Sequence, residues 1–515
     1  MQSFLTRHAS CVKGVLSGFD RVRFRGTLRW LAHVEGLRGY LSYKSVLLKN
    51  FTEHAKSLTH SIKRATKELA AERQPIEYLQ SSRCSKEEVA REIAERNGVT
   101  EGLVCVLSCL EPCFTFEVGP NRATKKLELR KMFGKCLHYY FYMIDPELGW
   151  MHVRLQTWLP FNVHVVINGR EWLAQELIRH QIPFERRENC FVDIADVPRA
   201  QELMDQQQRT NWTALLQRLL HQVHPTHQTL FDTEVFDYYW SANETEVATD
   251  VMFRTPEDLA SVYPSFVRHA ITSFGSDYVL RFLGKRPHVQ KFSTAEILSY
   301  LANRVEGICV RHALNSNWIK MYDKLGWLLR IETIINNTRE MKVFRASEND
   351  PDGPKAYRIL RKGVADLHRR VQISQKSNAR YLEALSVVDS ETPLAETADK
   401  ICRRTTRNGR SVRALNPLSD GDAKLLEAVN RGEFALLGFR NRDLCRLLFA
   451  DQPDLSEKQK MTKANRLIQL LRAHKLVQKV PHTHRYQLTP SGRETITAIL
   501  ASRAASTKKL TQLAA

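Results

Sequence analysis

Alternating apolar and polar positions mark the first part of the chain as rich in strands. In GVLSGFDRVRFRGTLRWL (Gly14–Leu31), Val22 and Phe24 alternate with arginines, which indicates an extended segment. Residues 103–118 have the composition of a strand, and CLHYYFYMIDPELGWMHVRLQTWLPF predicts a β-hairpin that turns at Asp145–Gly149. Strand and helix patterns continue to residue 208. We therefore expect an α/β domain with a largely antiparallel sheet over residues 100–210.

The following region, residues 211–390, has mostly helical periodicity and one strong hairpin over residues 315–337. Asp323–Gly326 suits a four-residue turn. If Tyr322 pairs with Trp327, then Trp318, Lys320 and Tyr322 share one face, while Arg330 and Glu332 lie on the other. The first face could stack bases around a lysine, or it could simply be core.

Two basic segments of this part could follow a nucleic-acid backbone, or could be solvated faces. RVRFRG places Arg21, Arg23 and Arg25 on one side of an extended segment. Tyr357–Leu385 predicts one long basic helix.

The clearest helical pattern lies near the end of the chain. Lys458–His474 has a stripe of apolar residues at helical spacing and a basic opposite face. A short strand (Leu476–Val480), a basic tip (Pro481–Arg485) and a second strand (Tyr486–Thr489) follow. The basic residues of this region and of the preceding segment are the candidates for nucleic-acid contact: Arg403, Arg404, Arg407, Arg410, Lys460, Lys463, Arg466, Arg472, His484 and Arg485.

These C-terminal residues resemble the winged-helix domains of MarR-type bacterial regulators. The run RLIQLLRAHKLVQKV, the hairpin PHTHRYQLT and the closing TPSGRE carry the resemblance, which covers about a sixth of the chain. It implies a helix that fits the major groove and a hairpin that contacts phosphate, although winged helices also serve as protein-docking modules. The rest of the chain resembles only uncharacterised bacterial reading frames with such a C-terminus, a pattern that suggests a mobile element.

Together these patterns predict an α/β (α+β) multidomain protein. We expect a central, mostly antiparallel sheet with helices, a region of helices and one hairpin, and a C-terminal winged helix. The expected division is residues 1–99 (an extended segment and helices), 100–210 (sheet domain), 211–390 (helical domain with hairpin 315–337), 391–416 (basic linker), 417–500 (winged helix) and 501–515 (flexible tail).

The charge distribution supports a polyanionic partner, with DNA favoured over RNA. The chain has a net charge of +21, and residues 401–515 alone hold 22 Lys and Arg against 9 Asp and Glu, a net of +13. An apolar run of the roughly 20 residues that a membrane span needs is absent, and the N-terminus lacks a signal-peptide pattern. We expect a cytoplasmic protein without a membrane partner.

Cysteines add one open alternative. The chain contains ten, which a reducing cytosol would keep as free thiols. Cys105, Cys109 and Cys113 are spaced by four, but zinc sites usually show closer pairs, so buried thiols are the favoured interpretation over zinc.

Two acidic residues are candidates for catalysis. Asp20 on an opening strand and Glu332 in the hairpin could hold Mg²⁺ for a nuclease or strand transferase, which needs three or four carboxylates. Alternatively, Glu332 pairs with Arg330 for structural reasons. Tyr322 could instead be a nucleophile, as in rolling-circle replication initiators, although the paired histidines that such enzymes need are not evident.

The sequence thus favours a nucleic-acid-binding protein, with a mobile-element nuclease, transposase or replication-initiation protein as the enzymatic form. The alternative is a non-catalytic DNA-binding regulator or an RNA-binding scaffold. Phosphate-binding glycine loops and the GxSxG motif are absent from the sequence, so an ATPase, a dehydrogenase or a serine hydrolase is not indicated.

Overall fold

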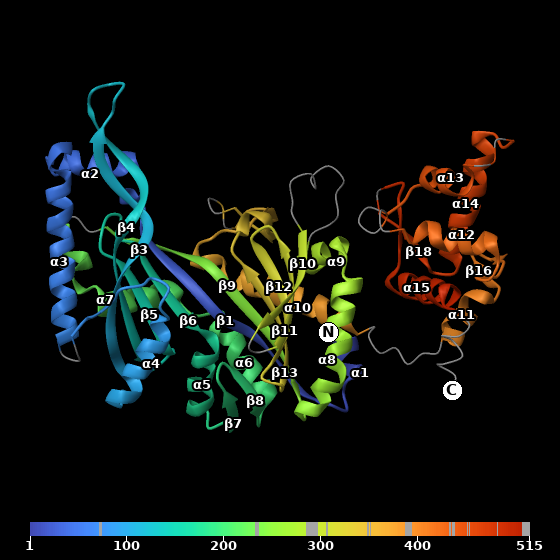
Figure 1. Ribbon diagram of the computed structural model, residues 1–515, viewed down its shortest axis with the longest axis horizontal. Helices are drawn as coiled ribbons and strands as arrows, with labels where there is room; N and C mark the ends of the chain where they lie inside the picture. Colours follow the sequence, from blue (N-terminus) through green and yellow to red (C-terminus); the bar gives the residue numbers. More distant parts are fainter. Residues whose placement is uncertain are drawn as a thin grey trace.

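A computed structural model places one long sheet at the centre of the protein (Figure 1). The structure describes residues 1–71, 75–231, 236–284, 297–304, 307–347, 350, 352–386, 394–431, 434, 438–450, 452, 454–481 and 483–506. Within these ranges, eleven strands pair in the order β10-β11-β12-β13-β9-β1-β6-β5-β4-β3-β2. All neighbouring pairs are antiparallel except β2 and β3, which confirms the predicted α+β class with a mostly antiparallel sheet.

The strands of this sheet come from most of the first 335 residues. They are β1 (Val12–Leu28), β2 (Glu77–Leu79), β3 (Gly102–Pro120), β4 (Leu127–Asp145), β5 (Gly149–Gln156), β6 (Val163–Asn168), β9 (Tyr238–Phe253), β10 (Ile297–Arg304), β11 (Gly307–Leu314), β12 (Asn317–Lys324) and β13 (Leu328–Ile335). The expected boundaries near residues 99 and 210 therefore do not separate sheets, because β1 lies between β9 and β6 in the middle of this one.

Helices surround the sheet. Those of the first 390 residues are α1 (Gln2–Arg7), α2 (Val34–Tyr43), α3 (Phe51–Ala71), α4 (Lys86–Asn97), α5 (Gly169–Arg179), α6 (Val197–Gln207), α7 (Trp212–Val223), α8 (Pro256–Ser273), α9 (Ser276–Phe282) and α10 (Leu367–Leu385). Small hairpins are formed by β7 (Phe184–Arg187) with β8 (Cys190–Ile194), and by β14 (Lys342–Arg345) with β15 (Ala356–Ile359).

The helix α10 fixes which face of the central strands is covered. Asn378 of α10 donates to the Val247 carbonyl and to Thr249 Oγ1 on β9, at 3.0 and 3.1 Å, and Thr333 of β13 donates to Asn378 at 2.6 Å. Val251 and Ile331 pack in the same core as α8 and α10. Side chains alternate along a strand, so the intervening residues of β9 and β13 lie on the opposite face.

The predicted long basic helix over Tyr357–Leu385 is wrong at its start. Ala356–Ile359 is strand β15, and α10 begins at Leu367. Arg361 and Arg369 are bound by the buried carboxylate of Asp366, so the arginines of this segment do not form the continuous basic row that a single helix would have given.

The region expected to be mainly helical is richer in strands than its pattern indicated. It contributes β9 to β13 to the sheet, in addition to α8, α9 and α10. β9 interrupts its apolar positions with the polar run SANETE, which hides the alternation of a strand that is buried over most of its length.

The C-terminal residues form a body with its own core (Figure 1, orange to red). Its elements are α11 (Leu394–Cys402), β16 (Thr405–Arg407), β17 (Arg410–Val412), α12 (Asp420–Val429), α13 (Asn441–Leu448), α14 (Glu457–Ala473), β18 (Val477–Lys479), β19 (Tyr486–Leu488) and α15 (Pro490–Ala504). An isolated antiparallel bridge joins Phe439 to Tyr486 of the β18–β19 hairpin.

The order is helix, bridge, two helices and hairpin, and α14 and the hairpin lie within two residues of their predicted bounds. The segment expected to be a linker is partly folded into the same body, because Ile401 and Leu415 are buried in its core. Residues 391–393 of that segment and 507–515 of the expected tail lie outside the described residues.

Candidate functional site

The register of the strands gathers polar side chains on one face of the sheet. Residues that pair directly across antiparallel strands point to the same side. Arg21 pairs with Asn168 and with Glu246, and Arg23 pairs with Val166 and with Glu244. Farther along, Lys320 pairs with Glu332, and Glu332 with Ala248. We call this side, opposite the α10-covered side, the polar face.

The basic half of the polar face is built from β1, β6, β5 and β4. Arg23 and Arg25 alternate with Val22 and Phe24, whose side chains are buried in the main core, so the arginines point to the other side. A cavity of about 350 Å³ lies over these strands. Its charged and aromatic lining is Arg21, Arg23, Glu87, Arg91, Tyr140, Trp150, His152, Arg154 and His164.

Two carboxylates in this half each contact two cations, whereas Glu87 pairs with Arg91. Glu111 lies 2.9 Å from Lys86 and 2.7 Å from Arg154. Glu244 lies 3.4 Å from Arg21 and 3.8 Å from Arg23. Even with the ion pair between Arg21 and Glu246, the cations of this half outnumber its carboxylates, so the group could attract an anion of suitable shape.

Burial and the neighbouring arginines lower the pKa values of two histidines in this half. Burial, together with Arg23, Arg21 and Arg154, lowers the pKa of His152 to about 4. Burial and the same kind of neighbours lower the pKa of His164 to about 3. Both imidazoles are therefore neutral near pH 7 and add no charge, but they offer hydrogen-bonding nitrogen atoms to the cavity.

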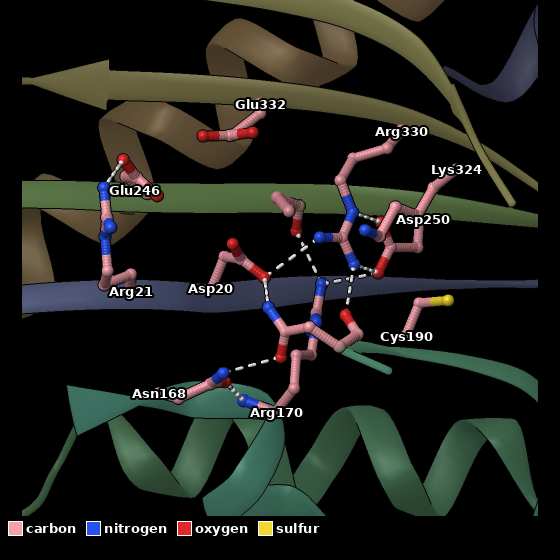
Figure 2. Close-up of polar contacts among 12 residues, drawn as sticks. Asp20, Arg21, Asn168, Arg170, Cys190, Glu246, Asp250, Lys324, Arg330 and Glu332 are labelled. Atoms are coloured by element: carbon pink, nitrogen blue, oxygen red, sulfur yellow. Dashed lines mark hydrogen bonds and ion pairs between the residues drawn. The ribbon is translucent and has the colours of Figure 1, made fainter. Parts of the chain in front are cut away.

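The other half of the polar face, formed by β1, β9, β13 and β12, contains carboxylates with matched cations (Figure 2). Arg330 is 1% exposed and bridges two aspartates. It donates to both oxygens of Asp250, at 2.6 and 2.9 Å, and to Asp20 Oδ1 at 3.0 Å. Arg170, at the start of α5, donates to Asp250 Oδ2 at 2.8 Å. We call Arg330, Arg170, Asp20 and Asp250 the buried charge cluster.

The two aspartates of this cluster differ in acidity. Burial tends to raise the pKa of Asp250, but Arg330 and Arg170 outweigh it and hold that pKa below its ordinary value. The pKa of Asp20 is raised, because burial and the charge of Glu332 outweigh the attraction of Arg330. Asn189 donates to Asp20 at 2.8 Å and thereby holds the carboxylate in place.

Two glutamates stand beside Asp20. Glu332 accepts from Tyr322 Oη at 2.9 Å and from Lys320 Nζ at 3.2 Å. Glu246 accepts from Arg21 at 2.6 Å, yet burial and the charge of Glu332 raise its pKa to about 7. Figure 2 shows Asp20, Glu246 and Glu332 arranged around a common space.

The structure thus brings the candidates Asp20 and Glu332 into one cluster, but as ion-paired groups. Their partners are Arg330 and Lys320. Among the described residues, Asp20, Glu246 and Glu332 do not form a set whose ligand atoms all lie within 4.8 Å of one another. The arrangement therefore holds carboxylates near one another without the close spacing of a ready metal site.

The predicted hairpin register is wrong, and the correction explains the position of Glu332. Tyr322 pairs with Arg330, and Lys324 with Leu328, so the loop is three residues long rather than four. Leu325 and Gly326 have φ of 59° and 77°, which a tight three-residue loop requires. An odd shift of register exchanges the faces of a strand. Arg330 and Glu332 therefore lie on the same face as Tyr322.

Tyr322, the candidate nucleophile, is bound to a carboxylate. Burial and the charge of Glu332 raise the pKa of its hydroxyl well above the ordinary value. A raised pKa disfavours the phenolate, so Tyr322 would need Glu332 as a base in order to attack phosphorus.

The C-terminal candidates fall into two groups. Lys463 and Arg466 project from α14 into solvent, and His484 is exposed at the tip of the hairpin. Arg404 and Arg410 are exposed near the β16–β17 hairpin. These five side chains are accessible to a ligand.

The other C-terminal candidates already have protein partners. Arg403 pairs with Asp399, and Lys460 lies 3.6 Å from Glu457. Arg407 and Arg472 donate to Gln469 at 2.8 and 3.4 Å. Arg485 donates to the Gly438 carbonyl at 3.1 Å, which links the hairpin tip to the segment of the Phe439 bridge.

Sequence reasoning missed several residues of the polar face. Glu246 and Asp250 lie in NETEVATD on a strand that was not predicted, and Arg154 lies in the predicted hairpin MHVRLQ without a local signal. Alternation of His152 and Arg154 with buried Val153 could have placed both on one face. Nothing local could have linked them to β1, which precedes them by more than a hundred residues.

Comparison with protein-family models, with curated proteins and with solved structures found no match. In the described part of the chain, every helix is too short or too polar to cross a bilayer.

Proposed function

We propose that this protein binds nucleic acid, with the basic half of the polar face holding the phosphate backbone. The supporting observation is the cavity of about 350 Å³, where arginines share carboxylates beside flat aromatic side chains. Guanidinium groups bind phosphate through paired hydrogen bonds. Trp150 stands in the wall of the cavity with the Arg91 guanidinium 4.6 Å from its ring centre, so a base could stack there only if Arg91 moved aside.

The C-terminal body supplies a second contact in this proposal. Lys463 and Arg466 lie one turn apart on α14, in the position of the helix that enters the major groove in winged-helix proteins. The exposed His484 lies in the hairpin that would reach the adjacent phosphates. We propose double-stranded DNA as the ligand of this body, in keeping with the resemblance to MarR-type regulators.

The test is a binding titration of the full chain with labelled single- and double-stranded DNA and RNA at several salt concentrations. Arg23→Ala combined with Arg154→Ala should weaken binding about tenfold and reduce the slope of log K against log salt by about one to two. Arg64→Ala on α3 is the matched control, because it removes an exposed arginine away from the polar face.

Lys463→Ala combined with Arg466→Ala separates the two surfaces. Binding to double-stranded DNA should weaken about tenfold, while binding to single strands should change less. If neither double variant differs from Arg64→Ala by more than about twofold, nucleic-acid binding by these surfaces is rejected.

A second candidate function is metal-dependent cleavage of the bound strand. The observation in its favour is that Asp20, Glu246 and Glu332 lie in the same part of the polar face (Figure 2) and that the pKa of both Asp20 and Glu246 is raised. A divalent cation would relieve this repulsion, and Mg²⁺ prefers carboxylate oxygens. Balanced ion pairs on the same residues argue for the binding function as the first choice.

Incubation of labelled DNA with the full chain and Mg²⁺ or Mn²⁺ tests cleavage. Cleavage that is lost in Glu332→Gln and kept in Arg64→Ala would support it. A covalent protein–DNA adduct that Tyr322→Phe abolishes would assign the nucleophile to Tyr322. Tight binding without any product in either metal would leave the protein as a non-catalytic binder.

A further inference from the structure

The long β3–β4 hairpin brings together two cysteines and a histidine beside the basic half of the polar face. Cys113 lies on β3, and Cys136 and His138 lie two apart on β4. Cys113 lies opposite Gly134 in the antiparallel β3–β4 pair. Because Gly134 has no side chain, there is space for the Cys113 thiol to approach Cys136. Among the described residues, these three form the one group of His, Cys, Asp or Glu whose ligand atoms all lie within 4.8 Å of one another.

The distances match the edges of a metal tetrahedron. The two Sγ atoms are 3.3 Å apart, and Cys136 Sγ lies 3.9 Å from His138 Nδ1. With Zn–S of about 2.3 Å and Zn–N of about 2.0–2.1 Å, tetrahedral ligand atoms are about 3.6–3.8 Å apart. Small side-chain rotations would therefore suffice to coordinate one ion.

The chemistry of the three groups also suits a metal. The hydrogen bond between the two thiols lowers the pKa of Cys113 and, together with burial, raises the pKa of Cys136, so a metal ion would have to displace the proton that the two sulfur atoms share. Burial and Arg154 lower the pKa of His138 to about 4, so its ring is neutral near pH 7. Nδ1 of His138 lies 3.1 Å from the Cys136 carbonyl, so metal binding at Nδ1 requires the neutral ring to carry its proton on Nε2 instead.

A cavity provides the fourth position. Cys113 and His138 line a space of about 190 Å³ together with Arg25, Arg154, Gln156 and His164. Two thiolates and one Zn²⁺ are neutral together, so the arginines of this cavity would favour an anion or a water molecule as the fourth ligand.

We propose that Cys113, Cys136 and His138 bind a Zn²⁺ ion whose fourth position faces this cavity. Soft sulfur ligands with one imidazole select zinc over magnesium or calcium. Binding releases the thiol protons to solvent, so the affinity rises with pH. The site differs from the set of Cys105, Cys109 and Cys113, for which the sequence favoured buried thiols over zinc: Cys105 and Cys109 pack with α4, and only Cys113 is shared.

The test uses the full chain, purified with Zn²⁺ and then with Co²⁺ in its place. We expect about one ion per chain and a thiolate-to-cobalt charge-transfer absorption. Cys113→Ser and His138→Gln should each weaken metal binding by about tenfold or more. Cys84→Ser is the matched control, because Cys84 is an exposed free thiol outside the cluster.

Alkylation of the unmodified protein gives a measurement that does not depend on the folding of a variant. Zn²⁺ should protect Cys113 from iodoacetamide, and a chelator should restore its reaction, while Cys84 and Cys402 react in both conditions. Absence of metal uptake by the reduced chain, or equal cobalt spectra in Cys113→Ser and Cys84→Ser, would overturn the proposal. The proposal would also be overturned if Cys113 and Cys136 form a disulfide in the purified protein and the protein binds no metal after this disulfide is reduced.

Discussion

The two halves of the polar face use arginine in opposite ways. In the buried charge cluster, Arg330 and Arg170 are almost fully enclosed and the two aspartates match their charge. In the basic half, the Arg21 and Arg23 side chains are each 44% exposed and share Glu244, and Arg21 also pairs with Glu246. Matched charges in a dry interior hold strands together, whereas shared charges at a surface leave attraction for a ligand. The same residue type thus serves structure on one side and recognition on the other.

Removing Arg330 should give the largest effect. Arg330→Met leaves Asp20 and Asp250 buried with one fewer cation, and should lower the free energy of unfolding by about 3–5 kcal/mol. Urea denaturation at pH 7 measures the change. Arg23→Met, which removes an exposed arginine of the basic half, should change stability by less than about 1 kcal/mol. If the two variants lowered the free energy of unfolding equally, the arginines of the two halves would not differ in their contribution to stability.

Glu246 should give an intermediate effect that depends on pH. The folded protein raises the pKa of Glu246 to about 7, above the ordinary value near 4.5, so ionised Glu246 destabilises the fold above pH 7. Glu246→Gln should therefore stabilise the protein at pH 8 by about 1–3 kcal/mol, and by much less at pH 4.5. Denaturation curves at the two pH values test this. Loss of stability at pH 8 would mean that the ion pair with Arg21 outweighs the repulsion from Glu332.

Histidines of the basic half should respond to pH with the opposite sign. The folded protein lowers the pKa of His164 from 6.5 to about 3, so the unfolded chain binds a proton first as pH falls below 6.5. His164→Gln should remove part of the acid destabilisation, about 1 kcal/mol at pH 5 for a partly exposed group. Unfolding at pH 5 and pH 8 checks it, with His180→Gln, an exposed histidine directly after α5, as the control. An equal change in both variants would mean that the arginines do not set this pKa.

Local pattern was sufficient for much of the fold. Gly14–Leu31, the turn at Asp145–Gly149 and helix α14 carry alternation, turn residues or helical spacing that depend on nearby residues alone. Strand β9 was not predicted, because most of its residues are buried and the polar run SANETE interrupts its apolar positions. Its sequence therefore lacks the regular alternation that marks a strand. Helix α10 was placed too early because the arginines that precede it pair with Asp366, which the sequence does not reveal.

The candidate site shows a different limit. Asp20 and Glu332 were chosen from their residue type and strand context, and they do lie in one cluster with Glu246. Their ion pairs with Arg330 and Lys320 depend on a hairpin register that differs from the predicted one by an odd number of residues. Such a shift leaves the strand preference of each residue unchanged but gives each residue different neighbours on the adjacent strand. The sequence therefore indicated these residues as candidates but did not predict their contacts.

The central position of β1 has a consequence for how the chain folds during synthesis. β1 pairs with β6 and β9, and its partner residues in β9 extend to Phe253. At a translation rate of roughly 5–20 residues per second, the first strand waits about ten to fifty seconds before its last partner emerges. During that time the apolar side chains of β1, including Val22 and Phe24, are not yet covered by the completed fold. The nascent chain can therefore aggregate or be bound by chaperones.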